Sequence, residues 1–292
     1  MNTAAIKAFI TATEEDSFSE AAEKLHLTQP GISKRIQALE NQLNCQLFDR
    51  IGRRIYLTQA GKAFLPHAYN ILQAAQSGVN AVKNLSNQVQ GELRVATTQH
   101  IGLHHLKGKV GDYVQTYPQV DFSLDFVHSR QAYADILKGK LELAIITAPS
   151  KLDSDLSFTP VYLEQLYFVC NHQHPIAQES VASLEKLSCY PAVLPDAESY
   201  TRRIIDQLFQ ARQLTIKASV PSNYLEALKV LVSAGLGWSV LPQGLIDESL
   251  HQIPVDNISM SREIGYLVHK SRSLSNAGEA FLEAIVKGSE RS

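Results

Sequence analysis

The sequence predicts a protein in two parts, a short and mostly helical N-terminal part and a longer α/β part. Three observations lead to this prediction. Residues 17–54 have the pattern of two short helices followed by a hairpin, residues 58–87 have the repeat of one long helix, and the chain beyond residue 91 alternates between apolar strands and helices. A length of 292 residues is enough for two or three domains with cores of their own.

The first helix of the N-terminal pair begins at a capping box. Ser17 can accept a hydrogen bond from the backbone N–H of Glu20, while the Glu20 side chain reaches back to the N–H of Ser17. A break at residues 27–28 ends this helix, and Thr28 can cap the next one. Pro30 then falls in a first turn, where its missing N–H costs nothing. The spacing therefore predicts a helix-turn-helix.

The second helix of the pair has two different faces. One face is apolar, with spacings of four, three and four residues: Ile32, Ile36, Leu39 and Leu43. The opposite face and its flanks carry Pro30, Ser33, Lys34, Arg35, Gln37 and Asn41. Such a polar face suits insertion into the major groove of DNA. An ordinary solvated helix is the alternative, and the preceding helix and the following hairpin favour the DNA-binding interpretation.

A basic hairpin is predicted after this helix, with its turn at Gly52. Arg50, Arg53 and Arg54 place three guanidinium groups at its tip, where they suit contacts with phosphates or with the minor groove. From residue 24 to residue 54 the chain has six Lys and Arg against two acidic residues. This local charge of +4, in a chain whose net charge is −2, indicates a polyanionic partner.

The run from Phe9 to Gly61 resembles the winged helix-turn-helix of the LysR-type transcriptional regulators. The segments SFSEAAEKLHLTQPGISKRIQALENQL, LFDR and LTQAG repeat the N-terminal signature of that family nearly position by position. The resemblance implies a bacterial cytoplasmic regulator that binds pseudo-palindromic operator DNA as a homodimer or homotetramer. RNA polymerase is expected as a further partner.

The family resemblance also assigns positions that approach the DNA. They match Thr28, Gln29, Pro30, Ser33 and Lys34, with Arg53 in the wing. Many members carry Arg where this chain has Lys34, and a lysine cannot form the bidentate contact of arginine with guanine. Base readout there is expected to be weaker or to shift to Arg35. The predicted DNA-binding residues are Thr28, Gln29, Pro30, Ser33, Lys34, Arg35, Gln37, Arg50, Arg53 and Arg54.

Composition places the protein in the reducing cytoplasm. No apolar run reaches the length of a membrane span, and the N-terminus MNTAAIKAFI contains no secretory signal. Cys45, Cys170 and Cys189 are odd in number and lack CxxC spacing, so neither a disulfide framework nor a zinc site is expected. The histidines at 104–105 and 172–174 have no carboxylate near them in the sequence. We therefore expect no metal and no cofactor.

Residues 58–87 are predicted to form a long helix that links the two parts. Apolar residues recur along it with heptad spacing, at Phe64, Ala68, Ile71, Ala75 and Val82. The helix would be roughly 45 Å long, enough to hold two DNA-reading heads apart. The repeat predicts a dimerisation seam, and the alternative is packing against the chain's own domain.

The remainder of the chain reads as two α/β lobes. Strands are predicted at residues 92–97, 120–127, 142–147, 166–171, 191–195, 216–220, 238–242 and 264–269. With crossings near residues 160 and 262, this pattern resembles the type 2 periplasmic-binding-protein-like sensor of the LysR family. The expected limits are 1–58 for the DNA-binding domain, 59–90 for the linker and 91–292 for the effector domain. Within it, lobe I takes 91–160 and 265–292, and lobe II takes 161–264.

An effector cleft is expected where the strands of the open sheet end, because ligands bind at carboxyl ends of strands. A helix start near residue 200 adds free N–H groups that suit an anion. The predicted effector residues are Thr97, Thr98, His100, Ser129, Thr147, Thr201 and Arg202. In LysR-type sensors the positions matching Thr98, His100, Ser129 and Thr201 touch the effector, although Ser or Thr is more usual at 100.

These residues favour a small carboxylate or oxyanion, because two basic side chains stand beside hydroxyl groups. A neutral hydrogen-bonding effector fits almost as well. The alternative is structural: Thr97 and Thr98 would cap a helix, and Arg202 would form a surface ion pair.

The sequence thus predicts a transcriptional regulator of LysR type whose DNA binding is controlled by a small-molecule effector. No Ser/His/Asp arrangement indicates catalysis, so the protein is not expected to be an enzyme. Two other interpretations stay open. One is a ligand-independent repressor or architectural protein, and the other is a regulator that senses redox state through Cys170 or Cys189.

Overall fold

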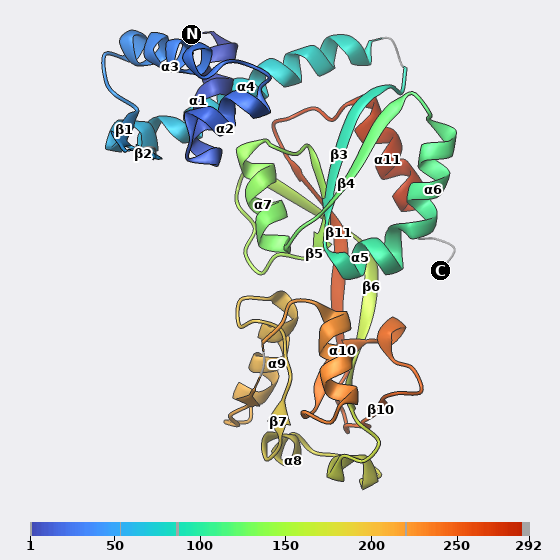
Figure 1. Ribbon diagram of the computed structural model, residues 1–292. Helices are drawn as coiled ribbons and strands as arrows, with labels where there is room; N and C mark the ends of the chain where they lie inside the picture. The colour runs from blue at the N-terminus through green and yellow to red at the C-terminus, as the bar shows by residue number, and fades with distance from the viewer. Residues whose placement is uncertain (1, 53, 86–87, 220, 288–292) are drawn as a thin grey trace. The chain divides into compact units, whose positions relative to one another are not determined.

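The computed structural model describes residues 2–52, 54–85, 88–219 and 221–287. The chain divides into two compact units, which are described separately (Figure 1). The first takes in the N-terminal helices and hairpin together with residues 134–142 and 271–276. The second takes in most of the α/β part.

The N-terminal unit begins with helices around one apolar core. Its elements are α1 (Thr3–Glu15), α2 (Phe18–Lys24), α3 (Gln29–Leu43), β1 (Phe48–Ile51), β2 (Arg54–Leu57) and α4 (Gln59–Asn84). Phe9 of α1 is fully buried against the rings of Phe48 and Phe64, at centroid distances of 5.3 and 5.4 Å. Ile32 and Ile36, from the predicted apolar face of α3, are fully buried in the same core. The faces of α3 are therefore as predicted.

Local hydrogen bonds begin and join these elements. The backbone N–H of Glu20 donates to Ser17 Oγ, and that of Gly31 donates to Thr28 Oγ1, both at 3.3 Å. The side-chain caps at Ser17 and Thr28 are therefore confirmed, whereas the return bond from the Glu20 side chain to the N–H of Ser17 stays a prediction. The Glu40 carboxylate accepts from the N–H groups of Leu47 and Phe48, which attaches the hairpin to α3.

The first half of α4 packs against the chain's own N-terminal unit. Phe64, Ala68 and Ile71 pack in the core of the chain's own N-terminal unit, because this stretch of α4 lies against α1. This packing agrees with the alternative to a dimerisation seam for the buried Ala68, whereas Phe64 and Ile71 are partly exposed and their dimer contact stays a prediction. Further along the helix Ala75 and Val82 are exposed, and Val82 and Leu85 leave 69% and 83% of their surface open.

The second unit is built on a seven-stranded mixed sheet. The strand order is β10-β6-β11-β5-β3-β4, and β9 also pairs with β6. The strands that follow β5 in the chain are β6 (Leu156–Cys170), β9 (Ser239–Pro242), β10 (His251–Gln252) and β11 (Met260–His269). Three parallel strands lie at one end: β3 (Gly91–Thr97), β4 (Val120–Phe126) and β5 (Leu143–Thr147). They form lobe I, where α6 (Lys107–Thr116) and α11 (Asn276–Lys287) cover the sheet through buried Tyr113 and Phe281 (Figure 1).

Two long antiparallel strands run from lobe I into lobe II. They are β6 (Leu156–Cys170) and β11 (Met260–His269), and each starts earlier than predicted. β11 pairs with β5 from Ile264 onward, and β6 pairs with β9 from Leu166 onward. Glu164 and Arg262 are direct partners in the register between these two regions. They therefore lie at the junction of the lobes.

Lobe II surrounds Trp238, which is fully buried. The indole stacks on Phe209 at 5.5 Å and donates from Nε1 to the Leu187 carbonyl at 2.9 Å. The elements of the lobe are α8 (Leu184–Ser188), β7 (Pro191–Ala192), α9 (Tyr200–Gln210), β8 (Lys217–Ala218), α10 (Leu225–Ser233), β9 (Ser239–Pro242) and β10 (His251–Gln252). Short 3₁₀ turns at Pro175–Gln178 and Gln243–Leu245 complete it.

Substitution of Gly265 tests the close approach of the crossing strands β6 and β11. A Cβ at Gly265 would overlap the carbonyl oxygen of Thr159, where the register of β6 and β11 shifts. We expect Gly265→Ala to lower the free energy of unfolding by about 1–3 kcal/mol, measured with urea. Gly111→Ala is the control, because Gly111 is an exposed residue of α6 and a Cβ there meets nothing within 4 Å. It should be neutral or stabilise by up to about 1 kcal/mol, and an equal loss in both variants would contradict this account.

Candidate functional site

The N-terminal unit exposes the predicted reading face of α3. Thr28, Gln29, Pro30, Lys34 and Gln37 are exposed, and the remaining two predicted residues, Ser33 and Arg35, are partly exposed. Gln29 Nε2 donates to Ser33 Oγ at 3.1 Å, so these two polar side chains are joined in the first turns of the helix. The face can offer amide, hydroxyl and cationic groups to the edges of bases.

The wing adds cations beside α2. Arg50 and Arg54 are exposed on β1 and β2, and the Arg50 guanidinium lies 4.9 Å from the centre of the Phe18 ring. Arg53 lies outside the described residues. Lys24, which contributes to the local charge, forms an ion pair with Glu15 at 2.5 Å, so its charge is locally balanced.

The second unit contains a cleft of about 660 Å³ between its lobes. Its volume is typical of small-molecule sites. Five predicted effector residues line it together: Thr98, His100, Ser129, Thr147 and Thr201. The carboxyl ends of β3, β4 and β5 lead into these residues from lobe I, and the start of α9 supplies Thr201 from lobe II.

Two predicted effector residues do not line the cleft. Thr97 is fully buried, and its Oγ1 donates to the carbonyl of Ile145 on the neighbouring strand. Arg202 is held by Asp206, at 2.8 Å from Nε, and by the Pro195 carbonyl. The structural alternative is therefore correct for Arg202. The next residue, Arg203, lines the cleft in its place.

Backbone and hydroxyl donors face this space from several elements. Ser199 caps α9 by accepting from the N–H of Arg202 at 3.1 Å. Thr98 precedes α5 (Gln99–Ile101) without forming a side-chain cap, so its hydroxyl is not committed to that helix. Lys151 and Arg203 also line the cleft, and among the described residues neither has a carboxylate ion-pair partner. Neither residue is among the predicted effector residues, because no sequence motif marks their positions in a loop and a helix.

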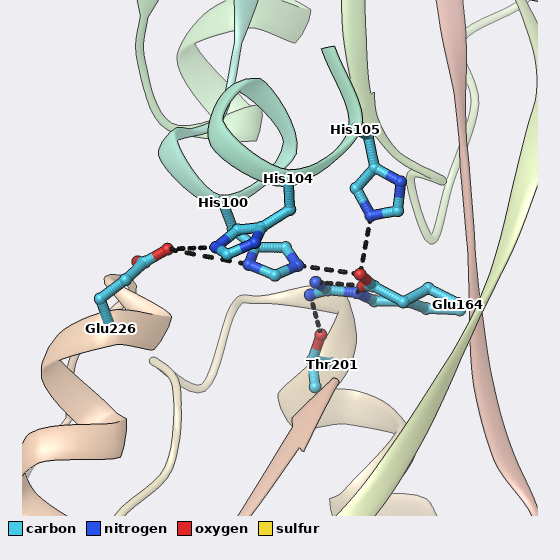
Figure 2. Close-up of polar contacts among 7 residues, drawn as sticks. His100, His104, His105, Glu164, Thr201 and Glu226 are labelled. Carbon is cyan, nitrogen blue, oxygen red and sulfur yellow. Dashed lines mark hydrogen bonds and ion pairs between the residues drawn. The ribbon is translucent and has the colours of Figure 1, made fainter. Parts of the chain in front are cut away.

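A polar cluster lies at the junction of the lobes (Figure 2), and three of its members, His100, Thr201 and Arg262, also line the cleft. His100 Nε2 and His105 Nε2 each lie 2.8 Å from Glu164 Oε1. Arg262 contacts Glu164 Oε2 through Nε at 2.6 Å and Nη2 at 2.5 Å. Arg262 also donates from Nη1 to Thr201 Oγ1 at 3.1 Å, which reaches lobe II.

A π-helical turn brings the three histidines together. Gly102–Leu106 is π-helical, and it follows α5 directly. A π turn hydrogen-bonds residues five apart, so His100 and His105 fall on one face. His104 lies beside His100, with ring centroids 4.6 Å apart and the rings tilted by 31°.

The protonation states follow from these contacts. Burial alone would raise the pKa of Glu164, but hydrogen bonds from His100 and His105 and the charge of Arg262 hold that pKa well below its usual range. Burial lowers the pKa of His100, against the opposing hydrogen bond and charge of Glu164. At neutral pH Glu164 is therefore a carboxylate and His100 a neutral imidazole that donates from Nε2.

The expectation that the paired histidines lack carboxylate neighbours is wrong for His104 and His105. Glu164 lies beside His105, and Glu226 of α10 lies 3.5 Å from His104 Nε2. These glutamates are 59 and 122 residues away along the chain, so only the fold brings them near.

Cys170 has the environment of a packing residue. It is fully buried in the core of lobe II, and burial raises the pKa of its thiol to about 11. A thiol with a raised pKa is a poor nucleophile, because the thiolate is the reactive form. Cys189 is exposed, with its thiol 3.3 Å from the carbonyl of Glu185.

Comparison with known proteins identifies the family. The family model for bacterial regulatory helix-turn-helix proteins of the lysR family matches residues 3–62, and that for the LysR substrate binding domain matches residues 86–289. The chain therefore belongs to the LysR family of transcriptional regulators. It has a DNA-binding helix-turn-helix domain and an effector-binding domain, and its family consists of regulators rather than enzymes.

Relatives and solved structures agree with this assignment. The chain is 31% identical to a probable RuBisCO transcriptional regulator of Trichormus variabilis over 93% of this chain and 84% of the relative. It is 30% identical to one from Synechocystis, covering 93% and 82%. A full-length OxyR variant from Pseudomonas aeruginosa has a TM-score of 0.75 at 24% identity, covering 98% and 94%. CbnR in complex with its target DNA has a TM-score of 0.65 at 22% identity, covering 99% and 100%, so both structures share the fold.

Among the described residues, no helix combines the length and the apolar character needed to cross a membrane.

Removing the charge of Glu164 at the lobe junction is expected to lower the stability of the protein strongly. Glu164→Gln would leave the buried Arg262 guanidinium without its counter-charge, and we expect the free energy of unfolding to fall by about 3–5 kcal/mol. Glu263→Gln is the matched control, because Glu263 is exposed on the same strand as Arg262. It should change stability by less than about 0.5 kcal/mol. Similar urea midpoints for both variants would show that the pairing contributes little.

Proposed function

We propose that this protein binds operator DNA through α3 and the wing, and that a small anionic effector in the cleft controls this binding. A small carboxylate or an inorganic oxyanion is the proposed effector class. The observation that carries the proposal is the convergence of Thr98, Ser129, Thr201 and Arg203 on one cleft at a helix N-terminus.

Helix geometry supports an anion in this cleft. The first N–H groups of a helix lack partners within the helix, and its dipole favours negative charge at that end. The 11-residue α9 starts at the cleft with Tyr200 and Thr201. Ser199 satisfies the N–H of Arg202, which leaves the earlier amides for a ligand.

The side-chain charges of the cleft are mixed, because the carboxylates of Asp196 and Glu226 line it as well as several cations. The proposed anion would bind beside the cations that have no carboxylate partner. Of the four Lys and Arg that line the cleft, Arg262 is neutralised by Glu164 and Arg130 by Glu198. Lys151 and Arg203 remain as cations for the ligand. Thr98 supplies a hydroxyl that can accept or donate.

Control of DNA binding then follows from linked equilibria. An effector that binds one relative lobe orientation better than the other shifts the population toward that orientation. In a homodimer or homotetramer joined through the exposed part of α4, including Ala75 and Val82, that shift would change the spacing of paired reading helices. The effector can change the equilibrium only by its difference in affinity for the two states.

The domain limits, the cellular location and the partners of the protein are part of the same proposal. The DNA-binding domain would end at residue 58, residues 59–90 would link it to the effector domain from 91 onward, and the lobes would divide as the sequence predicts. The start of α4 at Gln59 and of β3 at Gly91 supports these limits. We propose that the protein acts in the cytoplasm, on double-stranded operator DNA, together with RNA polymerase. Similarity along the whole chain to named transcriptional regulators supports this role.

Two substitutions separate base readout from phosphate contact. Gln29→Ala should relax the choice of base at one or two operator positions, at a cost of about 1–3 kcal/mol on the preferred sequence. Arg54→Ala should weaken binding to all sequences and reduce the salt slope by about 1. Lys24→Ala is the control, because its ammonium is paired with Glu15. Fluorescence anisotropy with operator and random duplexes measures all three, and identical profiles for Gln29→Ala and Arg54→Ala would refute the assigned roles.

A thermal-shift screen tests the effector class. Small carboxylates, sulfur and nitrogen oxyanions and neutral polyols are added to the full-length protein, and a true effector stabilises by mass action, about 2.7 kcal/mol at 100 times its Kd. Arg203→Ala should weaken binding of an anionic hit, whereas Arg202→Ala should leave its affinity unchanged. Stabilisation by polyols alone would contradict the anionic class. The absence of any hit would favour the ligand-independent repressor.

A further inference from the structure

Three side chains at the lobe junction point at one small space. His100 and His104 approach it from lobe I, and Glu226 of α10 approaches it from lobe II (Figure 2). Glu226 Oε1 lies 3.8 Å from His100 Nδ1 and 3.5 Å from His104 Nε2. One ligand atom from each residue lies within 4.8 Å of the others.

The atoms that face this space lack hydrogen bonds. His100 Nδ1 and both carboxylate oxygens of Glu226 are buried without a hydrogen-bond partner among the described residues, at distances too long for hydrogen bonds to one another. The His100 side chain is only 4% exposed. A buried polar atom without a partner costs about 1–3 kcal/mol, and one cation bound by all three residues would satisfy these atoms together.

Glu164 orients the His100 ring in the way that a carboxylate usually orients a metal-bound histidine. A metal-bound imidazole typically donates its other N–H to a carboxylate, which fixes the tautomer. His100 Nε2 lies 2.8 Å from Glu164 Oε1, so a hydrogen bond donated from Nε2 to this carboxylate leaves Nδ1, which faces Glu226, free to bind a cation. Glu164 is held in turn by Arg262.

A second group of possible ligands, His100, His105 and Glu164, is less suitable. Both oxygens of Glu164 are already occupied, one by two imidazoles and the other by Arg262. A cation there would stand beside a guanidinium and displace existing hydrogen bonds. The group with Glu226 has no such competition.

We propose that His100, His104 and Glu226 form a binding site for a divalent transition metal of the Zn²⁺ class. Two imidazoles and one carboxylate suit Zn²⁺, Co²⁺, Ni²⁺ or Fe²⁺, whereas Ca²⁺ and Mg²⁺ prefer all-oxygen sites. Tetrahedral ligands at metal distances of 2.0–2.1 Å lie roughly 3.3 Å apart, close to the observed separations. Three protein ligands leave a coordination position open, and His100 and Glu226 also line the cleft.

Metal binding at this site would connect the two lobes. The histidines belong to lobe I and the carboxylate to lobe II, so the metal prefers the orientation in which all three ligands meet. The ion is therefore a ligand whose affinity depends on lobe orientation. This proposal does not depend on the anionic effector, and the metal alone tests it.

Isothermal titration of the full-length protein with Zn²⁺ is the test, with Co²⁺ absorption as the report of coordination geometry. We expect one site per chain and visible Co²⁺ bands typical of four or five ligands. His104→Ala and Glu226→Gln should each weaken Zn²⁺ binding by about 100-fold and abolish those bands. Circular dichroism checks that both variants remain folded.

Two further variants test whether Zn²⁺ binds at the proposed site and not at other histidines. His105→Gln should retain the site, because His105 faces Glu164 and not Glu226. His172→Ala should also retain it, since it removes an exposed histidine that lies beside His251 in lobe II. Loss of binding in either control, unchanged binding in both His104→Ala and Glu226→Gln, or no Zn²⁺ binding by the unaltered protein would overturn the proposal.

Discussion

The effector domain depends on one buried carboxylate, Glu164. It lies where the two crossing strands leave one lobe and enter the other, directly opposite Arg262 in the register. Two charges taken out of water are tolerated only when hydrogen bonds satisfy them fully. Two imidazoles and a guanidinium fork supply those bonds here. The junction therefore holds a fixed set of protonation states and contacts rather than a flexible hinge of apolar residues.

Both ligand spaces of this domain adjoin that carboxylate. Arg262 extends from Glu164 to the hydroxyl of Thr201, at the start of α9 where an anion is proposed to bind. His100 extends from it toward Glu226, where a metal is proposed. A ligand in either space changes the electrostatic surroundings of the same junction. This shared element is the physical basis on which either ligand could bias the orientation of the lobes.

Short-range patterns predicted much of the fold. The caps at Ser17 and Thr28 depend on residues three apart, and the faces of α3 depend on periodicity, so both could be read directly. Periodicity could not tell which partner covers an apolar face, and Phe64 and Ala68 of α4 proved to pack on their own domain. Thr97 does not line the cleft because its side chain is buried against β5, where it donates to the carbonyl of Ile145, and this strand pairing could not be read from the sequence. The carboxylates beside the histidines come from distant strands and helices, which no local pattern reveals.

A double-mutant cycle of Glu164→Gln and Arg262→Met, followed by urea unfolding, tests the central role of the junction most directly. We expect strong coupling between the two substitutions. Arg262→Met should raise the free energy of unfolding of Glu164→Gln, because it removes an unpaired buried charge, although it should lower that free energy in the unaltered protein. Coupling of at least about 2 kcal/mol is the expected result. Additive losses, with the double variant less stable than either single one, would contradict the claim that this buried pair holds the lobes together.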